Sequence, residues 1–117
     1  MLFQVRQEKG IIIITVKSPV FDESCQAEFL KLLDDLIAKG DVFIDLDVSE
    51  VRYIDLAGLS MVTKGMIRAN DGGGKFTMIN TTPELNFKIA ELREQLFAFH
   101  DKLMKHLDTF PPKDKSN

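Results

Sequence analysis

The chain has 117 residues, 44% of them hydrophobic, which is enough for one compact domain and leaves no room for a second domain of ordinary size. Its 15 Lys and Arg residues against 18 Asp and Glu residues give a net charge of −3, which argues against nucleic acid binding because phosphate backbones attract basic surfaces. The longest apolar run, Ile11 to Ile14, is far shorter than the roughly 20 residues of a membrane-spanning helix. The single cysteine, Cys25, cannot close an intramolecular disulfide, and no secretory signal pattern opens the chain. We therefore expect a cytoplasmic protein without membrane insertion.

The first segment predicts a β-hairpin. Apolar and β-branched residues between positions 2 and 5 and between positions 11 and 16 flank the turn pair Lys9-Gly10. Two strands joined by so short a turn are antiparallel.

A helix is predicted between residues 23 and 39, with Gly40 as its C-terminal stop. Its apolar residues recur at helical spacing: Phe29, Leu30, Leu33, Leu36 and Ile37. Residues 42–48 then predict a central strand, parallel to an earlier one because a helix separates them.

A second helix is predicted over residues 58–69. Its buried stripe is expected to contain Leu59, Val62, Met66 and Ile67, which leaves Met61, Gly65 and Arg68 on the outward face. The three glycines at 72–74 break the chain before a short strand at 75–79.

The sequence Thr82-Pro83-Glu84 supplies a cap, a first-turn proline and a first-turn acid for a third helix, which buries Leu85, Ile89 and Leu92. Residues 96–99 are predicted to form a brief edge strand. Asp101 then caps a last short helix with Leu103, Met104 and Leu107. The domain is expected to span residues 1–109, and the tail at 110–117 to be disordered because apolar residues do not follow its two prolines.

This order of elements predicts an α/β fold, in which helices cover at least one face of the sheet. No internal repeat interrupts it.

Catalytic and metal-binding patterns are weak in this sequence. His100 and His106 are six residues apart, which places them on different faces of a helix. The segment Gly72-Gly73-Gly74-Lys75 resembles a phosphate loop, but Phe76 stands where Ser or Thr is required, and a hairpin-like or helix-to-strand turn is favoured.

The remaining candidates have simpler explanations. Asp45, Asp47 and Asp55 could form an acidic magnesium pocket, but solvated or capping carboxylates are favoured. Cys25 lacks a histidine in a nucleophile motif and is expected to be a buried thiol. We predict no catalytic residue, no metal and no cofactor.

The segment from Val42 to Leu59, with its Asp55-Leu56-Ala57-Gly58-Leu59 turn, resembles the central signature of STAS domains, the family of bacterial anti-sigma-factor antagonists. In that family a hydrophobic strand ends near a D-S-x-G-L turn that opens a helix. The resemblance extends upstream to Phe21-Asp22 with Ala27 and Leu30, downstream to Gly73-Gly74-Lys75 and residues 85–99, and covers roughly residues 2–107.

The resemblance implies a mixed β-sheet with helices mainly on one face, and a protein without enzymatic activity. Family members bind an anti-sigma kinase, and phosphorylation of the serine after the turn aspartate releases that partner. Here Leu56 occupies the matching position and has no hydroxyl group to accept a phosphoryl group. Switching by that route is therefore in question.

The candidate partner-binding residues are Asp55, Leu56, Ala57, Gly58, Met61 and Gly65. Asp55 has a second interpretation, in which it only caps the following helix. Ser60, four residues after Leu56, is a displaced candidate for phosphorylation, although serines are common in a first helical turn.

The leading functional hypothesis is a partner-switching regulator that binds an anti-sigma factor of the serine kinase type. An alternative is an unphosphorylatable scaffold component of a larger signalling assembly. A small enzyme or receiver domain would need an acidic pair after the first strand, which the sequence lacks. We expect a monomer or a weak homodimer.

Overall fold

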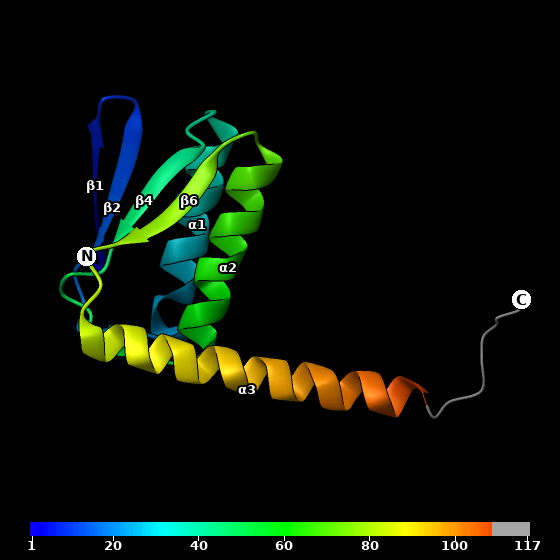
Figure 1. Ribbon diagram of the computed structural model, residues 1–117. Coiled ribbons are helices and arrows are strands. Elements are labelled where there is room, and N and C mark those ends of the chain that lie inside the picture. Colours follow the sequence, from blue (N-terminus) through cyan, green and yellow to red (C-terminus); the bar gives the residue numbers. More distant parts are fainter. Residues whose placement is uncertain (109–117) are drawn as a thin grey trace, which may run out of the picture.

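The computed structural model describes residues 1–108 (Figure 1). The tail predicted to be disordered, residues 110–117, lies outside the described residues. The elements in chain order are β1 (Phe3–Glu8), β2 (Ile11–Val16), β3 (Val20–Phe21), the 3-10 helix η1 (Glu23–Cys25), α1 (Gln26–Ala38), β4 (Phe43–Asp47), β5 (Tyr53–Ile54), α2 (Leu56–Asp71), β6 (Lys75–Ile79) and α3 (Pro83–Asp108).

The main sheet has four strands in the order β1-β2-β4-β6. The β1–β2 pair is antiparallel, while β2–β4 and β4–β6 are parallel, so the predicted mixed sheet is confirmed. The predicted hairpin turn is also confirmed: Lys9 and Gly10 both have positive φ, 52° and 83°, as a tight turn between twisted strands requires.

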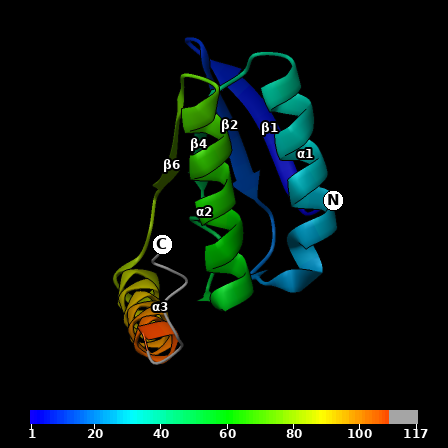
Figure 2. The same ribbon diagram turned by 90° about the vertical axis from the view of Figure 1, so that its right-hand side faces the viewer.

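Helices α1 and α2 lie side by side on one face of this sheet (Figure 2). Alternation along the strands directs Ile14, Ile44 and Leu46 toward the helices, where Leu33 is fully buried. An aromatic cluster of Phe3, Phe21, Phe29 and Phe76 joins both layers, with ring centroids 5.6 to 6.4 Å apart.

Helix α1 ends as its sequence predicts. Gly40 has φ 87° and its N–H donates to the Ile37 carbonyl, while the Asp41 N–H donates to the Leu36 carbonyl. This left-handed glycine closes the helix and turns the chain toward β4.

The prediction for residues 96–108 is partly wrong. The expected edge strand at 96–99 and the separate helix after Asp101 are both parts of α3, which runs without a break for 26 residues. The run Leu96-Phe97-Ala98-Phe99 is compatible with a strand by propensity, but it continues the helix that begins at Pro83. The predicted start is confirmed, because the Leu85 N–H donates to Thr82 Oγ1 at 3.1 Å.

No helix among residues 1–108 is both long enough and apolar enough to cross a membrane.

Candidate functional site

A two-stranded parallel sheet, β3 with β5, supports the turn that the sequence singled out. Val20 pairs with Tyr53 and Phe21 with Ile54. Each strand has only two residues, too few to show an alternating pattern, so the sequence predicts no strand here. The ladder ends at Phe21 and Ile54, and the next residue on each strand, Asp22 or Asp55, caps a helix, so two helix-capping aspartates lie at the same end of the ladder.

The Asp55 carboxylate caps α2 by accepting a hydrogen bond from the Gly58 N–H at 3.0 Å. Asp55 itself is extended, with φ −119° and ψ −171°, and Leu56 is the first helical residue. The capping interpretation is therefore confirmed as one role of Asp55.

Asp22 caps η1 in the same way. Its carboxylate accepts from the Ser24 hydroxyl at 2.5 Å and from the Ser24 N–H at 2.9 Å. These hydrogen bonds, the hydroxyl first, lower the pKa of Asp22 below its ordinary value, so the carboxylate is charged at neutral pH.

The turn presents an apolar side chain to solvent. Leu56 is 42% exposed, Ser60 is exposed one helical turn later, and Ala57 is half-buried. Gly58 is buried against the β3 strand. Hence, of the four turn residues in the predicted partner surface, Leu56 offers the clearest accessible contact.

Besides Gly58, two further members of the predicted partner surface are buried. Met61 is only 1% exposed and Gly65 is buried, whereas Met66 and Ile67, predicted to be core residues, are 44% and 55% exposed. The reason is close approach: a Cβ at Gly65 would stand 2.7 Å from the Phe76 ring, so α2 meets β6 through its glycine. The expected outward face centred on Met61 is therefore wrong.

Arg68, the third residue of the expected outward face, takes part in a surface ion pair. Arg68 is half-buried and forms an ion pair with Asp34, which joins α2 to α1. It is therefore a structural contact between the two helices.

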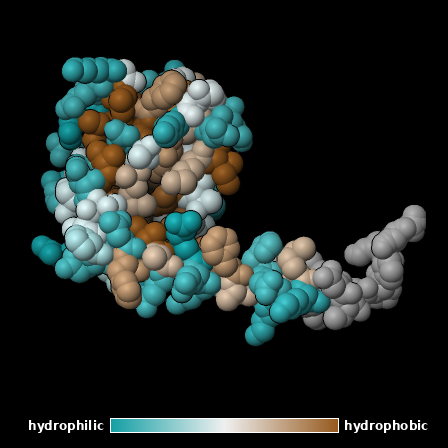
Figure 3. Space-filling model, viewed as in Figure 1, coloured by the Kyte–Doolittle hydropathy of each residue, from teal (hydrophilic) through white to brown (hydrophobic). Residues whose placement is uncertain are grey.

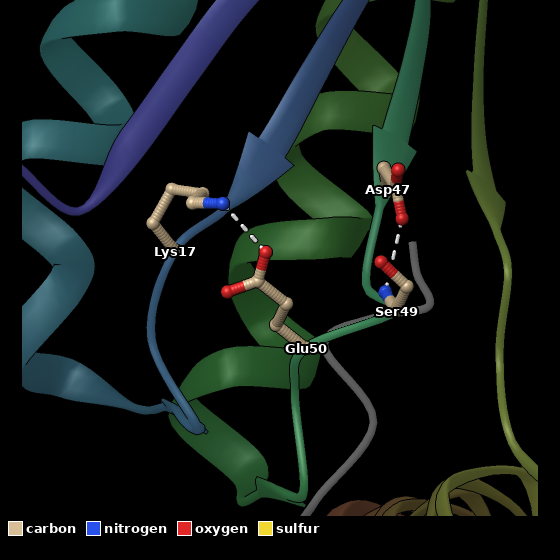
Figure 4. A network of polar contacts seen from close by, with 4 residues as sticks. All are labelled: Lys17, Asp47, Ser49 and Glu50. Carbon is tan, nitrogen blue, oxygen red and sulfur yellow. Dashed lines mark hydrogen bonds and ion pairs between the residues drawn. The ribbon is translucent and has the colours of Figure 1, made fainter.

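Two loops beside the turn are tied together by backbone and side-chain bonds. The N–H groups of Arg52 and Tyr53 both donate to the Pro19 carbonyl, at 2.7 and 3.0 Å. The Lys17 ammonium pairs with the Glu50 carboxylate at 2.6 Å (Figure 4). These interactions hold together the loop before β3 and the loop before β5, and we call the two loops the platform.

Asp47, the last residue of β4, stabilises the start of the loop that leads to β5. Its carboxylate accepts from the Ser49 N–H at 2.9 Å (Figure 4). Burial raises the pKa of Asp47, but the hydrogen bonds from Ser49 and Asn80 and the charge of Arg6 outweigh that effect, so the pKa is lowered overall. Asp47 acts as a structural anion, and the structure does not join it with Asp55 in an acidic pocket.

Helix α3 borders the platform at its first turns. The Lys88 ammonium lies 5.8 Å from the centroid of the Tyr53 ring, within the range of a cation–π contact. Sequence reasoning missed this contact because it joins residues from two elements that are remote in the chain.

In the part of the chain that the structure describes, the other candidate sites do not form a catalytic or metal-binding arrangement. Cys25 is fully buried, and its thiol donates to the Val20 carbonyl at 3.4 Å. Residues Gly72 to Gly74 join the end of α2 to β6, which confirms the helix-to-strand turn. Among the described residues, no group of three His, Cys, Asp or Glu side chains could hold a metal ion.

Comparison with solved structures shows the same fold in proteins of low sequence identity. Protein TM1081 of Thermotoga maritima, a candidate anti-sigma factor antagonist, is 17% identical with a TM-score of 0.66, and the match covers 80% of each chain. The anti-sigma factor antagonist SpoIIAA in its unphosphorylated form is 14% identical with a TM-score of 0.60, over 92% of this chain and 99% of that one.

A third match is part of a much larger protein. The murine anion transporter Slc26a9 is 25% identical with a TM-score of 0.53, over 74% of this chain but only 14% of the transporter. No curated protein sequence matches the chain. The family model of the STAS domain matches residues 3–108, almost the whole length, and the chain therefore belongs to the STAS domain family.

Proposed function

We propose that this chain is a non-enzymatic, cytoplasmic bacterial regulator that binds an anti-sigma factor of the serine kinase type in a partner-switching pathway. The docking surface consists of the turn residues Asp55, Leu56 and Ala57, with Ser60 beside them, and the buried Gly58 supports the turn from within the protein. Membership of the STAS family and the likeness to antagonist structures support the kind of function.

The observation that carries the proposal is the exposed Leu56 on a rigid turn. An apolar side chain 42% exposed beside a capped helix start gains free energy when a partner covers it. The cap at Asp55 and the bonds to Pro19 hold the turn in one conformation, so little conformational entropy is lost on binding.

Leu56 also bears on how such binding is regulated. Since leucine has no hydroxyl group, a kinase cannot place a phosphoryl group at this position, and the complex is not released by that reaction. Ser60 is exposed one turn along α2 and is the displaced candidate acceptor.

A second candidate function is a scaffold component of a larger signalling assembly. Leu56 favours it as well, because permanent attachment needs no release step. The two proposals differ in partner: the regulator binds an isolated anti-sigma kinase, and the scaffold binds only the assembled complex.

The test is a calorimetric titration of the chain with purified kinase-type anti-sigma factors from the same organism. Leu56→Asp should weaken the complex at least tenfold, roughly, because the new charge must be desolvated in the interface. Ile67→Asp is the matched control: Ile67 lies on the same helix, is 55% exposed and is outside the proposed surface. Equal affinity of wild type and a folded Leu56→Asp variant would place the surface elsewhere.

A further inference from the structure

Helix α3 is much longer than the body it packs on. Its 26 residues extend about 39 Å at 1.5 Å per residue, while a six-residue strand of the sheet spans about 20 Å. Figure 1 shows its C-terminal half projecting past both the sheet and α2. Leu85 and Leu92 are buried, whereas the side chains described from Arg93 onward are exposed.

This projecting half has an apolar side. Leu96 is 43% exposed, Phe97 68% and Met104 45%. In the sequence, Leu85, Ile89, Leu92 and Leu96 are spaced by four, three and four residues, and Phe99 and Leu103 continue with three and four. These five spacings average 3.6 residues and alternate between four and three, an alternation also found in helices that pair along a seam. The body buries Leu85 and Leu92 of this seam, whereas Leu96, further along the helix, is exposed.

A cleft opens where the projecting helix leaves the body. Its volume is about 500 Å³, and its lining is mostly apolar: Leu59, Val62, Thr63 and Met66 of α2, Met78 of β6, and Ile89, Arg93, Leu96 and Phe97 of α3. In Figure 3 the surface is concave where the body meets the projecting helix. Of the described residues that line the cleft, one, Arg93, is charged.

We propose that this cleft and the projecting half of α3 form an interface with a second copy of the chain, in which the two α3 helices run antiparallel around a two-fold axis near Phe97. Leu96 and Phe97 belong both to the cleft and to the exposed helix side, so each copy carries the groove and the helix that fits it. A single two-fold axis then satisfies both sites at once, as in other self-complementary dimers.

The size of the surface indicates how strong the dimer is. Nine residues line the cleft, while a stable interface of standard size uses roughly 20 to 30 residues per partner. The cleft alone is therefore smaller than a standard interface, and the exposed side of α3 adds to it. We accordingly expect a weak dimer, with a dissociation constant on the order of micromolar, that forms and dissociates with concentration.

The experiment is sedimentation velocity of the full chain between roughly 1 and 500 µM, a range that brackets a micromolar dissociation constant. The wild type should shift from monomer to dimer across it. Phe97→Glu should raise the dissociation constant at least tenfold, roughly, because it buries a charge at the centre of the interface.

Phe87→Glu is the matched control. Phe87 is 70% exposed on the same helix but does not line the cleft, so this variant should dimerise as the wild type does. Circular dichroism checks that both variants fold, and Phe97→Ala repeats the test without a charge.

Three results would overturn the proposal. They are a wild type that remains monomeric at the highest concentration, a dimer that survives Phe97→Glu and Phe97→Ala, and a dimer that Phe87→Glu disrupts equally. A wild type that remains monomeric would indicate that a different protein binds in the cleft. Leu56→Asp, which tests the proposed function, should leave the dimer unchanged, so the two proposals can fail separately.

Discussion

The backbone of Gly58 packs directly against the carbonyl oxygen of Phe21. A Cβ atom on residue 58 would overlap that oxygen and stand 2.7 Å from the Cγ1 atom of Ile54. The start of α2 can thus approach the β3 strand only because residue 58 has no side chain, and this approach fixes where Leu56 emerges.

Gly58→Ala should accordingly destabilise the fold by about 2 kcal/mol or more, because neither the Phe21 backbone nor the β3–β5 ladder can move away cheaply. Urea denaturation measures the change. Ala57→Ser, at the neighbouring half-buried position, is the control and should cost less than about 0.5 kcal/mol. A Gly58→Ala protein as stable as wild type would show that the turn is looser than the structure has it.

Leu56→Ser tests whether the turn can accept a phosphoryl group. Wild-type protein incubated with a kinase-type anti-sigma factor and ATP should gain no phosphate at position 56, whereas Leu56→Ser should gain one. Intact-mass spectrometry counts the phosphates. Leu56→Ser combined with Ser60→Ala distinguishes the two positions, and stoichiometric phosphate on wild type that Ser60→Ala abolishes would establish the displaced acceptor instead.

Leu33 is the test of how α1 packs on the sheet. It is fully buried, so Leu33→Ala should cost about 2 to 5 kcal/mol, the usual range when a buried leucine leaves a cavity. Lys31→Ala is the control, because Lys31 is exposed and makes only a surface ion pair with Asp35. A loss below about 0.5 kcal/mol in a denaturant melt of Leu33→Ala would contradict the observed helix phase.

Asp47 should make stability depend on pH in the acid range. Its pKa is lowered in the folded protein, while an unfolded aspartate titrates near about 3.9. The stabilisation is therefore complete above that value and is lost as the pH falls through the folded pKa.

Asp47→Asn should cost about 1 kcal/mol at neutral pH, and the cost should shrink as the pH falls below about 4. Denaturation at a series of pH values measures this. Thr15→Ala is the control, because Thr15 is buried beside Asp47 across β2 and β4 but does not titrate, so its cost should not follow the same curve. A pH-independent cost for Asp47→Asn would show that its charge is not what the Ser49 loop requires.

Local pattern alone determined much of this protein. The Lys9-Gly10 hairpin, the helix that ends at Gly40, the central parallel strand at 43–47 and the Thr82 cap all follow from propensity, spacing and capping chemistry within a few residues. The turn from Asp55 to Gly58 was also recognisable, since a capping aspartate and a glycine stand at fixed positions in it.

Tertiary structure alone decided three other features. The two-residue strands β3 and β5 exist because they pair with each other, and neither carries a pattern of its own. Residues 96–99 continue α3, although their apolar run suggested a strand. In α2, Met61 is buried and Met66 is exposed, the reverse of what the spacing of apolar residues predicts. The helix instead approaches the Phe76 ring through Gly65, and a residue without a side chain gives no hydrophobic signal in a sequence.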